Sequence, residues 1–169
     1  MIELSPPVPI RDGHQTSLFD CGKPQLNDFL RLHALDKQNA MLSRTYVVAS
    51  GLRVVGYYTL TFVSVRQEES PKKLGRGMPS TIPAVLMARF AVDRSVQGKG
   101  LGRSLFVDAI RRTWAVMESG AAPVRLFVVD AKDEEAKRFY EKFDMIPSTV
   151  NPLRLFLSYK TVRDLFAEA

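Results

Sequence analysis

The 169-residue sequence is poor in the side chains that build cross-links and metal centres, with one cysteine, Cys21, two histidines and one tryptophan. A single cysteine cannot form an intrachain disulfide, so a disulfide framework is excluded and a reducing compartment is favoured. His14 and His33 are the only imidazoles and no Cys/His cluster has ligand spacing, so we expect no metal. No apolar run is long enough to span a bilayer and no basic-then-apolar leader opens the chain. We therefore expect a cytoplasmic protein without a membrane partner.

The composition is that of an ordinary globular domain with a basic balance. Hydrophobic residues make up 46% and charged residues 25%, which excludes wholesale disorder. The length predicts one domain over residues 1–169. The net charge of +6, from 24 Lys and Arg against 18 Asp and Glu, favours an acidic partner such as a nucleic acid or a phosphorylated cofactor.

Hydrophobic periodicity predicts alternating helices and strands after a lead-in loop over residues 1–16. We expect helices at about 24–37, 101–117 and 134–142, strands at 45–49, 54–65, 84–92, 124–129 and 153–159, and a short terminal turn or helix over 162–169. Residues 54–65 pair with 45–49 as a hairpin, and Gly56 within it marks a bulge or a close backbone approach. Residues 66–80, with two glycines and two prolines, predict a long mobile loop. The order predicts an α/β fold with a mixed sheet.

Residues 97–102, Gln97-Gly98-Lys99-Gly100-Leu101-Gly102, stand between a predicted strand and a predicted helix. We call them the glycine loop. Free amides and the helix dipole at such a turn favour an anion. The spacing fits neither the dinucleotide fingerprint nor the P-loop. Two readings stay open here: a phosphate site, or glycines that only permit tight helix–strand packing.

The glycine loop matches the acyl-CoA pattern Q/R-x-x-G-x-G/A, and the chain resembles the GNAT acetyltransferase superfamily. Ala136, Phe139 and Tyr140 match its A-x-x-F-Y element, and Ala91-Val92-Asp93 stands where its central strand meets the cofactor. The resemblance is closer to the toxins of bacterial toxin–antitoxin pairs. It rests on Phe19-Asp20-Cys21-Gly22 with Leu26-Asn27-Asp28-Phe29-Leu30, and on further segments up to Leu157. One departure is Asp144-Met145 where Gly-Phe is usual, and Asp tolerates the left-handed cap conformation less easily than Gly.

The resemblance implies a GNAT-like sheet with helices on both faces, acetyl-CoA as co-substrate and no metal. Backbone amides of the glycine loop would hold the pyrophosphate with Lys99 and Arg103, and an N–H near Ala91 or Val92 would polarise the thioester carbonyl. Tyr140 would protonate the leaving thiolate, and Asp133 would contact the pantetheine arm or serve only as a first-turn helix charge. The implied cofactor-binding residues are Ala91, Val92, Asp93, Gln97, Gly98, Lys99, Gly100, Leu101, Gly102, Arg103 and Asp133.

By the same resemblance the substrate is the α-amine of aminoacyl-tRNA, and a homodimer and a ribbon–helix–helix antitoxin are expected partners. Contacts to RNA are expected from Lys72, Lys73, Arg76 and Arg89, whereas Arg138 and Lys142 are better read as solvated surface. The sequence shows no strong candidate for a general base. Glu68 and Glu69 lie in the predicted loop over residues 66–80, where acidic side chains are usually solvated. This agrees with an α-amine, whose pKa of about 8 leaves a neutral fraction. Acetylation of a small amine or a protein N-terminus, or an acyl-CoA-binding module without catalysis, stays open.

Overall fold

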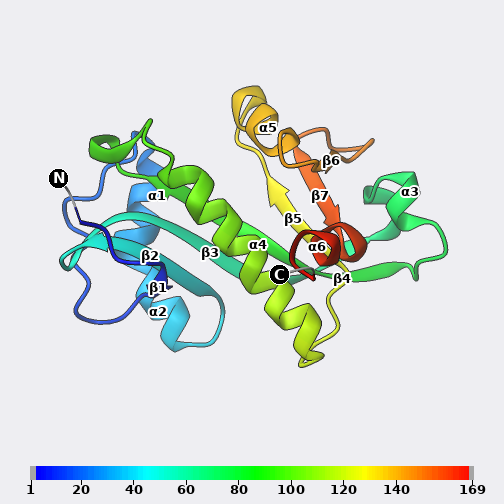
Figure 1. Ribbon diagram of the computed structural model, residues 1–169, viewed down its shortest axis with the longest axis horizontal. Coiled ribbons are helices and arrows are strands. Elements are labelled where there is room, and N and C mark those ends of the chain that lie inside the picture. Colours follow the sequence, from blue (N-terminus) through cyan, green and yellow to red (C-terminus); the bar gives the residue numbers. More distant parts are fainter. Residues whose placement is uncertain (1–2, 168–169) are drawn as a thin grey trace. The chain divides into compact units, whose positions relative to one another are not determined.

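The computed structural model describes residues 3–167, and its helices and strands follow the predicted order with short additions (Figure 1). The strands are β1 (Val8–Pro9), β2 (Arg44–Ser50), β3 (Arg53–Arg66), β4 (Thr81–Val92), β5 (Leu126–Asp130), β6 (Ile146–Pro147) and β7 (Arg154–Ser158). The α-helices are α1 (Pro24–Asp28), α2 (Ala34–Asn39), α3 (Lys72–Gly75), α4 (Leu101–Ser119), α5 (Glu134–Glu141) and α6 (Tyr159–Phe166). A π-helical segment, η1 (Phe29–His33), joins α1 to α2, and 3-10 turns stand at η2 (Gln67–Glu69) and η3 (Arg94–Val96).

Among the described residues the strands form one seven-stranded sheet in the order β1-β2-β3-β4-β5-β7-β6. β4 and β5 run parallel, from Ala84 opposite Leu126 to Met87 opposite Val129. β1 with β2, β2 with β3, and β7 with both β5 and β6 run antiparallel. The predicted mixed α/β sheet is therefore confirmed.

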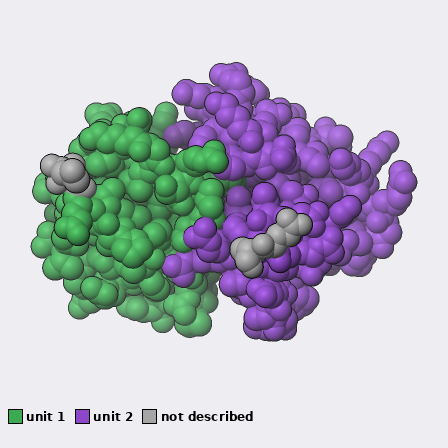
Figure 2. Space-filling model, in the orientation of Figure 1, with its two compact units in different colours: residues 1–61, 88–109 green, residues 62–87, 110–169 purple. Residues whose placement is uncertain are grey.

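The chain is organised as two compact units, coloured separately in Figure 2. Unit 1 consists of Met1–Thr61 and Ala88–Ala109, and unit 2 of Phe62–Met87 and Ile110–Ala169. β3, β4 and α4 each contribute residues to both units. The glycine loop belongs to unit 1, and α3, α5 and α6 belong to unit 2.

In unit 1, neighbouring residues of β3 contact helices on opposite faces of the sheet. The Tyr57 ring lies 5.5 Å from the Phe19 ring and 6.3 Å from the Phe29 ring of η1. The next residue, Tyr58, donates a hydrogen bond from its hydroxyl to Asp108 of α4. Because side chains alternate along a strand, η1 and α4 cover different faces here (Figure 1). The expectation of helices on both faces is confirmed in this unit.

The start of α4 lies directly against β3 at Gly56. A Cβ placed there would be 2.9 Å from Leu105 Cδ1, closer than side chains pack. The β2–β3 register also shifts at this point, with Val48 opposite Gly56 but Ala49 opposite Val54. Gly56 thus lies at a bulge, as the sequence suggests, and the close approach at this position is made by the side chain of Leu105 rather than by backbone.

Unit 2 has a separate hydrophobic core and a charged network on its sheet. Arg154 of β7 donates from Nε and Nη2 to the Asp130 carboxylate at 2.7 and 2.8 Å, and its Nη1 lies 3.6 Å from Glu69 Oε2. Glu69 also accepts from Arg66 Nη2 at 2.9 Å. These ion pairs connect η2 to β7. The buried core residues of this unit are Val65, Ile82, Ala84, Leu126, Val128 and Phe156.

Residues 66–80 carry two short helical turns, η2 and α3, where the sequence predicts an open loop. Gln67 N donates to Ser80 O at 2.9 Å and Gln67 Nε2 to Gly75 O at 2.8 Å, so the two ends of the segment are bonded together. A side chain that bonds backbone eight residues away leaves no periodic pattern, and composition alone therefore suggests a loop. The π-helical η1 and the two-residue β6 were also not predicted.

Two helix ends follow the predicted chemistry. Gly120 comes directly after α4 with φ of 69°, the left-handed conformation of a helix-terminating glycine. Asp144, three residues after α5, has φ of 65°. Aspartate therefore takes the left-handed position where the family usually has glycine, as expected from its tolerance of that region.

Candidate active site

The glycine loop joins the end of β4 to α4 through the short turn η3. Gly98 and Gly100 have φ of 76° and 84°, which L-residues with side chains rarely adopt. A Cβ at either position would meet no atom within 4 Å. These two glycines are therefore required by backbone conformation and not by tight packing. The packing explanation applies instead to Gly56 on β3.

The first turn of α4 is suited to a negatively charged group. This helix is 19 residues long and has no acidic residue in its first turn. Its leading N–H groups have no intrahelical acceptor, and the dipole places partial positive charge there. Lys99 and Arg103 are exposed and add two cationic side chains to the same segment. The anion-binding reading of the loop is supported by these features.

The last residues of β4 extend beyond its pairing with β5. The β4–β5 register ends at Met87, whereas β4 continues to Val92. Ala91 is buried, and Val92 is half-buried. The backbone of this extension belongs to unit 1, next to the glycine loop.

The side chain of Asp93 is buried and bonded inside unit 1. Its Oδ2 accepts from Asp20 N at 2.8 Å, and its Oδ1 accepts from Ser95 N at 2.9 Å and Ser95 Oγ at 2.7 Å. Burial acts to raise the pKa of Asp93, but these hydrogen bonds and the nearby Arg53 guanidinium outweigh it and hold the pKa below its usual value. Asp93 is therefore a carboxylate at neutral pH. We assign its side chain a role in holding the chain after β4.

The side chain of Gln97 is exposed, but its amide bonds back to the protein. Its Nε2 donates to Val92 O at 2.8 Å and to Cys21 O at 3.3 Å. Sequence reasoning places Gln97 among the cofactor-binding residues but does not foresee this direction. Asp20 bonds to Asp93, and Asn27 bonds to Asp20 and Cys21. The sequence analysis did not include Asp20 and Asn27 among the site residues, and only their place in the N-terminal signature could have indicated a role for them.

Tyr140 lies on α5 of unit 2, with only 7% of its surface exposed. Its ring centroid is 5.4 Å from that of Phe139 in an edge-on arrangement. Burial, with a smaller effect from the Asp130 carboxylate, raises the pKa of Tyr140 well above its usual value. The hydroxyl is therefore protonated at neutral pH and can serve as a proton donor.

Asp133 is the N-cap of α5. Its Oδ1 accepts from Ala136 N at 2.8 Å, and its backbone is extended, with φ of −163°. This is the usual geometry of an acidic N-cap. One carboxylate oxygen is thus engaged in helix capping, which supports the first-turn explanation of this residue. A contact with the pantetheine arm stays a prediction.

The basic residues expected to contact RNA lie in both units. Lys72 and Lys73 on α3, and Arg76 just after it, are exposed side chains of unit 2. Arg89 belongs to unit 1, where its guanidinium lies 4.7 Å from the centroid of the Phe29 ring. The exposed position and the aromatic neighbour explain how β4 accommodates a charged side chain.

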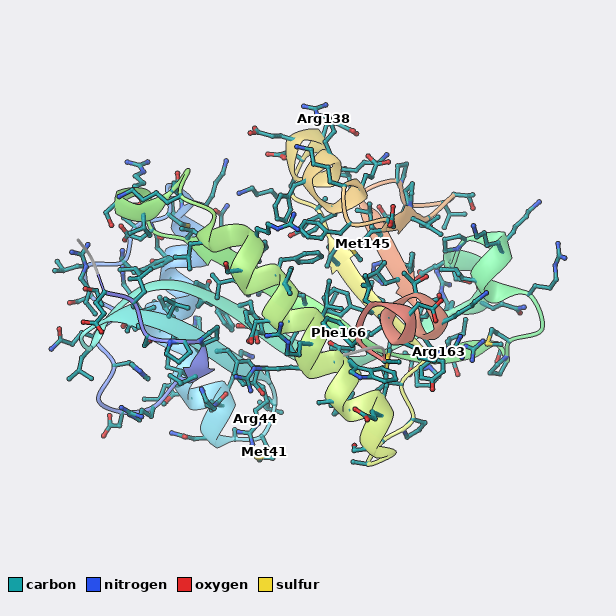
Figure 3. The ribbon with its side chains drawn as sticks, in the orientation of Figure 1. Met41, Arg44, Arg138, Met145, Arg163 and Phe166 are labelled. Carbon is teal, nitrogen blue, oxygen red and sulfur yellow. The ribbon has the colours of Figure 1, made fainter. Side chains whose placement is uncertain are left out.

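Two further basic residues and the candidate bases are surface features. Arg138 points outward from α5 (Figure 3), and Lys142 is likewise exposed. Both agree with a solvated surface. Glu69 is held in the ion pairs with Arg66 and Arg154, and Glu68 is exposed. Neither has the surroundings of a general base.

Within residues 3–167 no group of three or more His, Cys, Asp or Glu side chains has the arrangement of a metal site. The helices in the described part of the chain are too short or too polar to cross a membrane.

The glycine loop, the β4 extension and the buried tyrosine agree with an acetyltransferase site, and comparison with known proteins identifies the class of this protein. Residues 42–144 match the family described as "Acetyltransferase (GNAT) domain". The match covers more than half of the chain, which therefore belongs to the GNAT acetyltransferase family.

The similarity extends to particular relatives over almost the whole chain. A tRNA-acetylating toxin of Mycobacterium tuberculosis is 38% identical over 168 residues, 99% of this chain and 100% of that protein. The structure of AtaT complexed with acetyl-methionyl-tRNAfMet has a TM-score of 0.88 at 30% identity, covering 97% of this chain and 99% of that one. A mutant AtaT toxin bound to the C-terminus of the antitoxin AtaR and acetyl-CoA has a TM-score of 0.81 at 29% identity, covering 98% and 99%.

Proposed function

We propose that this chain transfers an acetyl group from acetyl-CoA to the α-amine of an amino acid esterified to tRNA, and so acts as a toxin that blocks translation. The full-length similarity to a tRNA-acetylating toxin carries the choice of substrate. The conformation of the glycine loop supports the choice of cofactor. The family match, which includes residues of both units, supports a single acetyltransferase domain over the whole chain.

In this proposal unit 1 holds the cofactor. Leading amides of α4, assisted by Lys99 and Arg103, bind the pyrophosphate, and an N–H of Ala91 or Val92 donates to the thioester carbonyl. Bound acetyl-CoA supplies an acyl thioester, whose carbonyl carbon is open to attack by an amine. The side chains of Asp93 and Gln97 fix the backbone that makes these contacts.

Unit 2 supplies the proton in the proposed reaction. The amine nitrogen bonds to the carbonyl carbon, the C–S bond breaks, and Tyr140 gives its hydroxyl proton to the departing thiolate sulfur. The α-amine of an aminoacyl ester has a substantial neutral fraction near pH 7, so it needs no strong base. Its proton passes to solvent, and solvent returns a proton to Tyr140, whose raised pKa favours the neutral hydroxyl.

Incubation with labelled acetyl-CoA and aminoacylated total tRNA should place label on the aminoacyl group. Mild base, which cleaves the ester, should release the label as N-acetyl amino acid. Matched reactions contain deacylated tRNA or free amino acids and should stay unlabelled. Label on a free amine or a protein N-terminus would instead support the alternative substrate, and acetyl-CoA binding without any transfer would support a binding module.

Charge reversal at the three exposed basic residues in the segment 72–76 should weaken the reaction with charged tRNA. The triple variant Lys72→Glu, Lys73→Glu and Arg76→Glu removes three cations that we assign to phosphate contacts. We expect the KM for charged tRNA to rise at least about tenfold, and the slope of log KM against log salt to fall by roughly 2, at about 0.7 per contact. Steady-state rates over a salt series measure both.

A triple variant with the same change in net charge serves as the control. Lys37, Arg125 and Lys160 are exposed and lie outside residues 72–76, so their conversion to Glu should leave the salt slope within about 0.5 of the unmodified protein. An equal loss in both triple variants would mean that only overall charge matters. Full activity of the first variant at all salt concentrations would favour a small amine or a protein N-terminus as the substrate.

The proposed partners follow from the same relatives. The similarity to a toxin whose structure is bound to the C-terminus of an antitoxin supports an antitoxin partner for this chain. We add to the proposal that the antitoxin is of the ribbon–helix–helix type, that the toxin is a homodimer, and that both act in the cytoplasm, where charged tRNA is used.

A further inference from the structure

The N-terminal signature has a structural connection that its sequence position does not suggest. Residues 19–22, here called the N-terminal turn, contact the end of β4 and the residues leading to the glycine loop. Arg94 N donates to Asp20 O at 2.9 Å, and Arg94 Nη1 lies 3.6 Å from Asp20 Oδ2. Asp20 N donates to Asp93 Oδ2. Gln97 Nε2 donates to Cys21 O. Segments more than 70 residues apart in the sequence are thereby bonded together.

The N-terminal turn is itself held by internal hydrogen bonds. Asp20 Oδ1 accepts from Gly22 N at 2.9 Å and from Asn27 Nδ2 at 3.1 Å, and Cys21 N donates to Asn27 Oδ1 at 2.9 Å. Gly22 has φ of 91°, and a Cβ there would lie 3.2 Å from the Arg94 guanidinium. The hydrogen bond from Gly22 N, with that from Asn27, lowers the pKa of Asp20. These hydrogen bonds close the turn on the side that faces the end of β4.

Gln97 joins this turn to the cofactor side of the site. Its amide group donates to Val92 O, five residues back, and so closes η3 against the end of β4. The second donation, to Cys21 O, fixes the same side chain to the N-terminal turn. Both N–H donors of the side-chain amide are thus directed at protein carbonyls. A cofactor phosphate would be met by the backbone that follows Gln97.

We propose that Gln97 is a positioning residue, and that it and the N-terminal turn together hold the glycine loop in its anion-binding conformation before acetyl-CoA arrives. The inference rests on the proposed function, because it takes acetyl-CoA as the ligand. Preorganisation of this kind raises affinity, since binding no longer has to order the loop. The proposal also gives the Phe19-Asp20-Cys21-Gly22 motif a role in cofactor binding. The family resemblance connects this motif to the toxins and not to the acyl-CoA loop.

Gln97→Met tests the inference, because methionine has a similar length and no donor. The Gln97 side chain is exposed, so the fold should persist, with a melting temperature close to that of the unmodified protein. We expect the Kd for acetyl-CoA, measured by calorimetry without any RNA, to rise roughly five- to tenfold, as for the loss of one or two hydrogen bonds. Gln97→Arg should recover most of the affinity, since a guanidinium can donate to both carbonyls.

The control substitution is Gln25→Met, at an exposed glutamine of α1, which should leave the Kd within twofold. Asp20→Ala should also raise the Kd, and the Gln97→Met, Asp20→Ala double variant should lose less than the product of the two single effects, because both act through one network. Gln97→Met with unchanged affinity, or fully multiplicative effects, would overturn the inference and leave the proposed function standing. An unmodified protein that does not bind acetyl-CoA would overturn both.

Discussion

Tyr140→Phe should reduce acetyl transfer by about 10²- to 10⁴-fold, the usual contribution of a positioned general acid. The substitution removes one oxygen and keeps the ring, which is buried at 7% exposure and packs edge-on against Phe139. The Kd for acetyl-CoA should therefore change little. Single-turnover rates with charged tRNA measure the loss, and expression in a sensitive bacterium should no longer arrest growth.

Tyr159→Phe is a matched control on α6, at a half-buried tyrosine to which we assign no part in catalysis. It should keep the full rate, and melting temperatures of both variants separate lost catalysis from lost stability. The pH profile gives a second test. Because burial raises the pKa of Tyr140 above its ordinary value of about 10, the acid stays protonated, and the rate should not fall between pH 8 and about 10 through loss of its proton. A Tyr140→Phe protein that still transfers acetyl groups at the normal rate would remove Tyr140 from this role.

Alanine at Gly98 and Gly100 should damage cofactor binding more than stability. Each position has a positive φ that costs a residue with a side chain about 1–2 kcal/mol. Because the loop is exposed, the strain is relieved most easily by rearrangement of the loop. We expect the double variant to raise the KM for acetyl-CoA at least about tenfold, with a smaller change in kcat.

The control for backbone strain is Gly51→Ala in the β2–β3 turn. Gly51 has φ of 61° and, like Gly98 and Gly100, open space where a Cβ would stand. This variant should lose comparable stability per substitution and keep its KM for acetyl-CoA. An equal rise in KM in both proteins would show that general destabilisation, and not the shape of the glycine loop, governs the affinity.

Much of the fold could be predicted from periodicity. The strands and helices around the glycine loop lie within a few residues of their predicted bounds, because long apolar segments such as β4 and α4 are read directly from their pattern. The short elements were missed for the opposite reason. η1, α3 and β6 each contain five or fewer residues, too few for a period to show.

In the candidate site, too, local features could be predicted from the sequence and long-range contacts could not. Gly98, Gly100 and Tyr140 could be selected from the sequence, since the conformational needs of glycine and the F-Y motif are local properties. Asp133 could be read as a helix-start residue for the same reason, and its capping bond to Ala136 agrees. The direction of the Gln97 side chain could not be predicted, because its two acceptors lie five and 76 residues away.

The sequence by itself therefore determined the class of the protein and the strand–turn–helix unit, and it selected the residues that we propose for the chemistry. These depend on local backbone preferences and on a motif whose order along the chain is diagnostic. Only the tertiary structure decided that Asp20, Asp93 and Gln97 share one hydrogen-bonded network, and that the N-terminal turn is bonded to Gln97 at the start of the glycine loop. Hydrogen bonds between distant segments depend on how the chain folds back on itself, and no pattern of neighbouring residues encodes them.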